Sequence, residues 1–454
     1  MSTTKDFLAG DYQLQDVVIY GQTLPRLSCR NLMLELNIYE SINSPYMSGN
    51  IILRDTMNHR SNMSMTGQEE IEFELRTNEF AESLDFKTFR GRIYKVSNII
   101  PTSNTEQVYT LHFVSMDAMR NSQTRVKQAY RGSTNSIISD VLTNVLKTQK
   151  LFYAEESSKF VHLLGNNRYP FEFIRMAAKR SISRDFGTTT YSFFENHRGY
   201  NFISKSNLFN ENKVETREPV ESFFTAHQRP QVDTPIEMRT LKSYQIMTTQ
   251  DTLRDNSNGL LNNTHYTYDR TGKSFSKEIS SYATYLNKVG INGFPLYTNT
   301  PESDSHNLFD FPDSTITVSS KDPYIHTQSN TDSQDYSNSS DRTADALRGS
   351  SSYGIKVKVE MHGNSNIGAG DLIHITYPNH EPIVSQSDDK TFDVFLTGNY
   401  LVESVNHRVD NNAYVTTCEV IRNSVETAYE SNDQSIADNN KTRFQTPGAL
   451  IDRL

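Results

Sequence analysis

Among the side chains of this sequence, the histidines are the best candidates for metal ligands. Twelve histidines are scattered along 454 residues, and the closest pair is His374 and His380, with His362 on the preceding predicted strand. Imidazoles gathered in this way could hold a metal ion. The sequence has no H-E-x-x-H motif and no paired C-x-x-C motif, so we favour histidines on a strand face or at the surface. We expect no metal and no cofactor.

Two glycine-containing stretches partly match phosphate-binding or nucleophile motifs. Gly272-Lys-Ser274 has the end of a phosphate-binding loop, but Thr267 stands where that motif requires its first glycine. Gly363-Asn-Ser365 starts like a G-x-S-x-G turn and then continues with Asn366 and Ile367. A phosphate cradle precedes a helix, whereas Gly363–Gly370 precedes a strand-like run, so we predict a hairpin turn there.

Carboxylates are abundant, and an Asp/Glu pair for glycoside hydrolysis remains an alternative, although no pair stands out. Glu69, Glu70, Glu72 and Glu74 place like charges along one predicted strand. We favour a solvated strand face that prevents edge-to-edge aggregation. The alternative is a negative lining that repels DNA in a channel. We therefore predict no catalytic residue and no enzymatic activity.

The elements that would position any site are mostly strands. Between Gly354 and Arg422, Ile355, Val357 and Val359 alternate with polar residues, and three further strand-like runs follow. Period-two alternation indicates strands with one buried face. We predict an antiparallel sheet of four strands that closes into a small barrel.

The preceding chain divides into three parts. Residues 12–118 carry several short alternating runs, such as Ile71-Glu-Phe-Glu-Leu75, and are predicted to form a first β-barrel or sandwich. Residues 119–186 are predicted to be helical, with one helix capped by Ser133 or Thr134 and another with Pro170 in its first turn. Residues 187–209 return to strands.

Residues 237–283 are predicted to open and complete the second barrel. Leu241–Thr248 reads as a strand, Thr249–Arg254 as one helical turn, and Tyr266 and Tyr268 as part of the next strand. Residues 300–350 are strongly polar, which favours a surface insertion or a piece ordered by a neighbouring subunit. Residues 426–454 form a polar tail with an apolar end, which either docks on a partner or frays.

Composition excludes several classes of protein. The net charge is −9 with no strongly basic segment, which argues against tight binding of nucleic acid. Cys29 and Cys418 are predicted to be buried free thiols. No apolar run has the length of a membrane span, and the N-terminus lacks a signal-peptide core. We expect a protein that folds in a reducing cytoplasm and does not insert into membranes.

Several stretches resemble the central baseplate hub proteins of T4-like contractile-tailed phages. The run Gly363–Asp371, followed by Gly398-Asn-Tyr-Leu-Val402 and Val405-Asn-His407, is similar to their second tube domain. Tyr39–Ile51 and Gly67–Phe73 are similar to the first. Pro170-Phe-Glu-Phe-Ile174, Tyr191–Asn196 and Gly199-Tyr-Asn-Phe202 resemble the domain between the two. The same barrel occurs in type VI secretion spike proteins.

The resemblance implies a mainly β fold in which two antiparallel β-barrel tube domains are joined by an α+β domain. The first barrel would occupy residues 1–118, the α+β domain 119–236 and the second barrel 237–425, with a polar insertion at about 285–353 and a tail at 426–454. Structural roles would fall to Gly363, Gly370, Asp371, Gly398 and His407.

The implied function is structural. Three copies would form a ring with pseudo-sixfold symmetry, because each chain carries two similar barrels. The ring would join a trimeric tail spike protein to the tail tube or a tube-initiator protein and contact baseplate wedge proteins. Its channel would pass the tape-measure protein and DNA without specific binding. The expected location is the virion tail baseplate, after assembly in the host bacterial cytoplasm.

Two rival functions remain. A hub of a type VI or extracellular contractile apparatus usually carries the spike on the same chain, and no repetitive β-helix follows the second predicted barrel here, which favours a phage protein. The other rival is a cell-wall-degrading tail enzyme. Turnover of labelled cell wall that one carboxylate substitution abolishes would support it.

Overall fold

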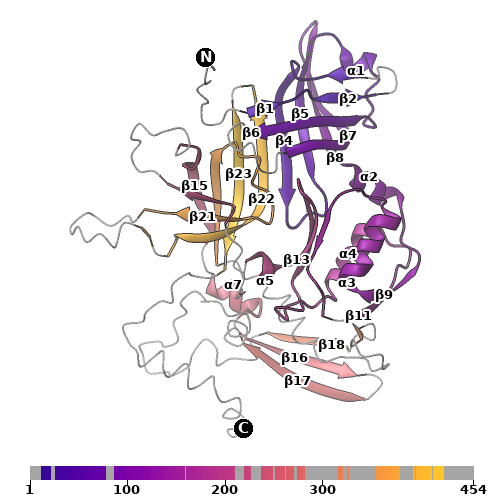
Figure 1. The fold of residues 1–454 in the computed structure, drawn as a ribbon, viewed down its shortest axis with the longest axis vertical. Coiled ribbons are helices and arrows are strands. Elements are labelled where there is room, and N and C mark those ends of the chain that lie inside the picture. The colour runs from indigo at the N-terminus through magenta and orange to yellow at the C-terminus, as the bar shows by residue number, and fades with distance from the viewer. Residues whose placement is uncertain are drawn as a thin grey trace, which may run out of the picture.

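The protein is mainly β, with a smaller helical part (Figure 1). The computed structural model describes residues 12–21, 26–77, 86–158, 160–209, 219–225, 237–248, 251–260, 262–269, 273–281, 315–320, 325–326, 354–378, 392–393, 395–411 and 413–423. The β-rich class predicted from the sequence is confirmed.

The N-terminal part is formed almost entirely by strands. Its elements are β1 (Tyr12–Leu14), β2 (Val18–Tyr20), β3 (Leu27–Ser28), β4 (Met33–Ser41), β5 (Ser48–Asp55), the short helix α1 (His59–Asn62), β6 (Glu70–Thr77), β7 (Phe86–Ser103) and β8 (Glu106–Ser115).

The middle part mixes helices with short strands. Its elements are α2 (Met116–Gln123), β9 (Ala129–Ser133), α3 (Thr134–Asp140), the π-helix η1 (Val141–Val145), β10 (Phe152–Ala154), β11 (Phe160–Leu164), α4 (Pro170–Ala178), β12 (Tyr191–Asn196), β13 (Gly199–Ser204), α5 (Lys205–Leu208) and β14 (Glu221–Phe224).

The C-terminal part returns to strands. Its elements are β15 (Leu241–Thr248), α7 (Thr252–Ser257), β16 (Asn262–Asp269), β17 (Ser274–Ser281), β18 (Ile316–Ser320), β19 (Ile325–His326), β20 (Ile355–His362), β21 (Leu372–Thr376), β22 (Gly398–Asp410) and β23 (Tyr414–Arg422).

One 14-stranded sheet joins the N-terminal and C-terminal parts of the chain. Its main path runs β15-β20-β23-β22-β4-β5-β8-β7-β6-β2-β3, and β1, β21 and β14 attach beside it. At its centre β4 pairs antiparallel with β22, from Ser41 opposite Ser404 to Glu35 opposite Asp410. We call this pairing the β4–β22 seam. In Figure 1 the indigo and yellow strands accordingly lie side by side.

Side-chain packing crosses the seam as well. Val409 of β22 and Tyr414 of β23 are buried in the same apolar cluster as Leu36, Ile38 and Phe113 of the N-terminal strands. A second cluster lies beneath α3 and α4, and a third lies between β20, β21, β22 and β23. Backbone hydrogen bonds and apolar burial thus both connect the chain ends.

The two predicted helices are present, but residues 119–186 are not helical throughout, because the range also contains β9, β10 and β11. Helix α3 follows Ser133 and continues as η1, which together bury Ile137, Ile138, Val141 and Leu142. The Ser133 side chain makes no capping hydrogen bond. Helix α4 carries Pro170 in its first turn, as predicted. No helix among the described residues is long and apolar enough to cross a membrane.

Two sequence predictions about strand pairing are wrong. Strands β20 and β21 do not form a hairpin, because β23 and β22 lie between them in the sheet, so residues 363–371 form a crossing loop. The strand that carries Tyr266 and Tyr268 does not extend the main sheet either. It is β16, which pairs with β17 and β18 in a separate sheet.

Part of the polar segment at 300–350 is ordered within the chain. Strand β18 pairs with β16, and β19 pairs with β11. Backbone pairing does not depend on side-chain polarity, which is why composition did not reveal these strands. Gly272 and His380, which the motif search considered, lie outside the described residues.

Candidate functional site: a buried polar junction

The crossing loop at 363–371 is buried between three parts of the chain. Gly363 lies against the ring of Tyr414, and a Cβ there would meet the Tyr414 Cγ at 2.0 Å. Gly370 has a φ of +88°, a conformation that glycine adopts without strain. Both glycines singled out in the sequence are therefore required by the path of this loop.

Glu40 of β4 binds the loop from the N-terminal side. One carboxylate oxygen accepts a hydrogen bond from the Ala369 amide at 3.0 Å, and the other accepts from the His197 amide at 3.0 Å. The Nδ1 of His197 lies 3.3 Å from the same carboxylate. Burial alone would raise the pKa of Glu40, but the charge and hydrogen bonds of its partners outweigh burial and lower it.

Asp371 holds the same, C-terminal end of the loop. Its carboxylate accepts a hydrogen bond from the Gly368 amide at 2.8 Å and forms an ion pair with Arg198 at 2.6 Å. Arg198 also donates to the Asn366 carbonyl at 2.6 Å. The turn between β12 and β13, which supplies His197 and Arg198, is therefore bound to the middle and to the C-terminal end of the crossing loop.

His407 of β22 lies beside this group and is fully buried. Its Nδ1 is 2.7 Å from the hydroxyl of Tyr414. Burial, opposed by Glu40 and reinforced by His197, lowers the pKa of His407 to about 4, so the ring is neutral at pH 7. We call Glu40, His197, Arg198, Asp371 and His407 the polar junction.

The same turn reaches the N-terminal strands through Glu195, at the end of β12. The buried carboxylate of Glu195 accepts hydrogen bonds from the Met47 amide at 3.2 Å and from the Ser115 hydroxyl at 2.7 Å. It also forms an ion pair with Lys150. Burial raises the pKa of Glu195 although Lys150 opposes the shift. The stretch Glu195–Arg198 therefore contacts all three parts of the chain.

The three buried carboxylates described above all accept hydrogen bonds from other groups of the fold. Glu40, Asp371 and Glu195 each accept bonds from backbone amides and carry a cationic or imidazole partner. Such an arrangement fixes backbone segments relative to one another. These contacts hold separate parts of the chain in place, so the three carboxylates have a structural role.

The acidic run on β6 forms a partly exposed strand face, as favoured from the sequence, but not at the edge of a sheet. Strand β6 pairs with β7 on one side and with β1 and β2 on the other, so it is not an exposed edge that needs protection. Each outward glutamate has an arginine neighbour: Glu70 pairs with Arg92, Glu72 with Arg90 and Glu74 with Arg76. The local charge is balanced and does not form a uniformly negative lining.

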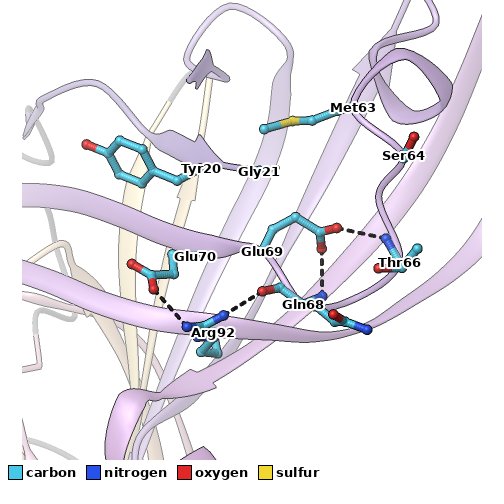
Figure 2. A pocket seen from close by; sticks show the side chains of 9 residues that line it. All are labelled: Tyr20, Gly21, Met63, Ser64, Thr66, Gln68, Glu69, Glu70 and Arg92. Carbon is cyan, nitrogen blue, oxygen red and sulfur yellow. Dashed lines mark hydrogen bonds and ion pairs between the residues drawn. The ribbon is translucent and has the colours of Figure 1, made fainter. Parts of the chain in front are cut away.

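A pocket of about 560 Å³ lies at the start of this strand (Figure 2). Glu69 points toward the adjoining loop, where it accepts hydrogen bonds from the amides of Thr66, Gly67 and Gln68. Glu70 and the Gln68 carbonyl both bind Arg92. The pocket carboxylates are therefore also bound to neighbouring groups of the fold.

The other residues considered from the sequence lie apart. Gly398 starts β22 opposite Ile375 and is outside the polar junction. His374 contacts Asn399 at 3.0 Å. No group of three or more metal-binding side chains gathers within the described part of the chain. Cys29 and Cys418 are buried free thiols, as predicted.

Sequence reasoning missed Glu40, His197 and Arg198. One signal was present: Glu40 follows Leu36 and Ile38 at period two and is buried with them. A carboxylate in the buried phase of a strand requires a partner. Nothing in the sequence identified that partner, because His197 is 157 residues away.

The fold is similar to that of a solved prophage tail protein. The 43 kDa tail protein of prophage MuSo2 from Shewanella oneidensis matches with a TM-score of 0.50 and 7% identity, over 90% of this chain and 98% of that one. The tail protein of Neisseria meningitidis MC58 gives a TM-score of 0.49 and 8% identity, over 91% and 97%. No protein-family model matches the sequence.

A curated relative gives a more specific similarity. The "probable baseplate hub protein gp334" of Vibrio phage KVP40 is 23% identical over 416 residues, which cover 87% of this chain and 91% of the relative. The resemblance to phage baseplate hub proteins is therefore confirmed over most of the sequence.

Proposed function

We propose that this chain is the central hub of the tail baseplate of a T4-like contractile-tailed phage. The similarity to a phage baseplate hub protein over 416 residues supports the class. The observation that carries the proposal is the β4–β22 seam with its polar junction. It joins the N-terminal and C-terminal strands in one sheet, as a part that transmits force between spike and tube requires.

The hub assembles as a homotrimeric ring. Each chain contributes two tube-type barrels, at 1–118 and 237–425, joined by the α+β domain at 119–236. Six barrels around a threefold axis give pseudo-sixfold symmetry only if the two barrels of each chain keep a fixed orientation. Continuous backbone pairing from β4 to β22 provides that orientation.

The partners follow from this geometry. One end of the ring holds the trimeric spike and the other holds the tail tube or tube-initiator protein, while wedge proteins bind outside. The tape-measure protein and DNA pass through the channel, and the net charge of −9 favours weak contact with DNA. The chain works by its surfaces and not as an enzyme, within the virion baseplate.

Co-purification with the two end partners tests the proposal. Tagged hub protein should retain the spike and the tube-initiator protein together, with three hub chains per spike trimer. If the two partners exclude each other, they compete for one surface, and the assignment of a connecting hub is wrong.

A further inference from the structure

The small sheet of β16, β17 and β18 carries an exposed apolar patch. One face carries Phe275 and Ile279 of β17, Ile316 and Val318 of β18, and Tyr268 of β16, which the strand register places together. All five side chains are exposed, with Val318 71% and Phe275 62% accessible. Thr264 at the start of β16 is buried on this face, so the exposed patch covers β17, β18 and the end of β16.

The opposite face is polar, and it is buried along β16 but exposed along β17. Asn263, His265 and Thr267 of β16 point to it and are all under 5% exposed. His265 lies 2.7 Å from the Thr317 hydroxyl and 2.9 Å from the Ser319 hydroxyl on β18. Half-buried sheets normally bury the apolar face and expose the polar one. The hydrogen bonds between His265 and the two β18 hydroxyls help to fix this register, which keeps the apolar side chains on the other face.

An exposed face of this kind requires a cover. The five side chains span three adjacent strands, at the foot of the molecule in Figure 1. Tyr266 adds to them, because its ring stacks on Phe275 at 5.2 Å. Soluble monomers rarely expose contiguous apolar patches larger than about 300–600 Å² unless another segment or protein binds there.

We propose that residues Phe444–Leu454 of the same chain bind this apolar face. This segment contains Phe444, Leu450, Ile451 and Leu454 and follows the mostly polar stretch Ser431–Arg443. Such a pattern favours an apolar segment on a polar tether. The proposal holds whether or not the chain acts as a hub, because it concerns a contact within one chain.

Charge and tether length support this occupant. Lys277 lies on the apolar face, opposite Tyr266 in the register, and Asp452 stands between the apolar residues of the segment. About 20 residues separate Asn423 from Phe444 and can span up to about 66 Å. A globular chain of this length has a radius of gyration of only about 22 Å, so the segment can reach the sheet.

Cysteine pairs in the full-length chain test the contact. Ile279→Cys combined with Ile451→Cys should form an intramolecular disulfide about tenfold faster than Ser276→Cys combined with Ile451→Cys. Ser276 is exposed on the same strand but points to the opposite face, so it is a matched control. The native thiols of Cys29 and Cys418 are buried and do not compete. Equal rates for the two pairs, or cross-links only between chains, would overturn the proposal.

A second pair of variants adds two negative charges, one variant in the apolar segment and the other in the polar stretch. Leu450→Asp with Leu454→Asp should speed hydrogen exchange at the amides of Phe275–Ile279 severalfold and increase binding of a hydrophobic dye. Asn439→Asp with Asn440→Asp adds the same charge in the polar stretch and should change neither readout. Unchanged exchange in the leucine variant would contradict the proposed contact.

Discussion

The amide of Ala369 donates a 3.0 Å hydrogen bond to the carboxylate of Glu40, although the two residues are 329 positions apart. This bond connects β4, near the start of the chain, to the crossing loop that leads into β21. Because Glu40 also binds His197, one buried side chain holds three parts of the chain together. Buried hydrogen bonds, as well as a common sheet, thus join the N-terminal and C-terminal parts of the protein.

Glu40→Gln should destabilise the protein by about 3 kcal/mol. The amide can keep one backbone contact but cannot accept from both Ala369 and His197 or balance charge, and breaking a buried pair typically costs 3–5 kcal/mol. Denaturant titration measures the loss. Glu72→Gln, which removes an exposed ion pair with Arg90, should change stability by less than about 1 kcal/mol. Equal effects would show that Glu40 has no special role.

Gly363→Ala should abolish soluble folded protein or lower its stability by several kcal/mol. The new methyl group would lie 2.0 Å from the Tyr414 Cγ, and the buried ring has no free space into which to move. Lys358→Ala on the exposed side of β20 is the control and should be nearly neutral. Circular dichroism and thermal melting distinguish the two variants. A Gly363→Ala protein that melts like wild type would show that the loop can shift freely.

His407 should make the protein sensitive to acid between about pH 6.5 and pH 4. Burial lowers its folded pKa to about 4, whereas the unfolded side chain titrates near 6.5. The unfolded chain therefore binds more protons in this window, and stability falls as the pH falls, by up to about 3 kcal/mol.

The matched variant is His407→Gln, which keeps a polar partner for Tyr414. Its stability should depend less on pH than that of wild type over the same window, although it is lower at pH 7. Stability curves from pH 7 to pH 4 give the comparison. Parallel curves for the two proteins would show that His407 does not titrate on unfolding.

Lys150→Met should destabilise the protein most at neutral pH. The substitution leaves the buried carboxylate of Glu195 without its cation, and burial already raises the pKa of that group. A raised folded pKa means that the native state takes up a proton first, so the deficit should shrink as the pH falls toward 5. Melting temperatures of both proteins at pH 7.5 and pH 5 test this. A deficit that grows in acid would contradict the account.

Local sequence patterns predicted the individual strands and helices well, but they predicted poorly which strands pair with one another. The alternation around Ile355, Val357 and Val359 identified β20, and Pro170 located the start of α4. The hairpin predicted at Gly363–Gly370 was wrong, because glycines that permit a turn also permit a buried crossing loop. Which strands become neighbours depends on contacts such as those of β4 with β22, which local sequence does not record.

Sequence analysis identified only some of the residues at the polar junction. Gly363, Gly370, Asp371 and His407 were singled out through family resemblance, and the structure brings them together. Glu40, His197 and Arg198 were missed because each is explained only by a partner more than 150 residues away. The exposed apolar patch on β16, β17 and β18 was missed for a related reason, since alternation shows two faces but not which one is buried.

The solution mass of the purified chain, alone and mixed with its candidate spike, tests the hub assignment most directly. The account predicts a species of three times 51.9 kDa that appears as a ring with an open lumen in particle images. A monomer under both conditions, with no ring, would contradict it.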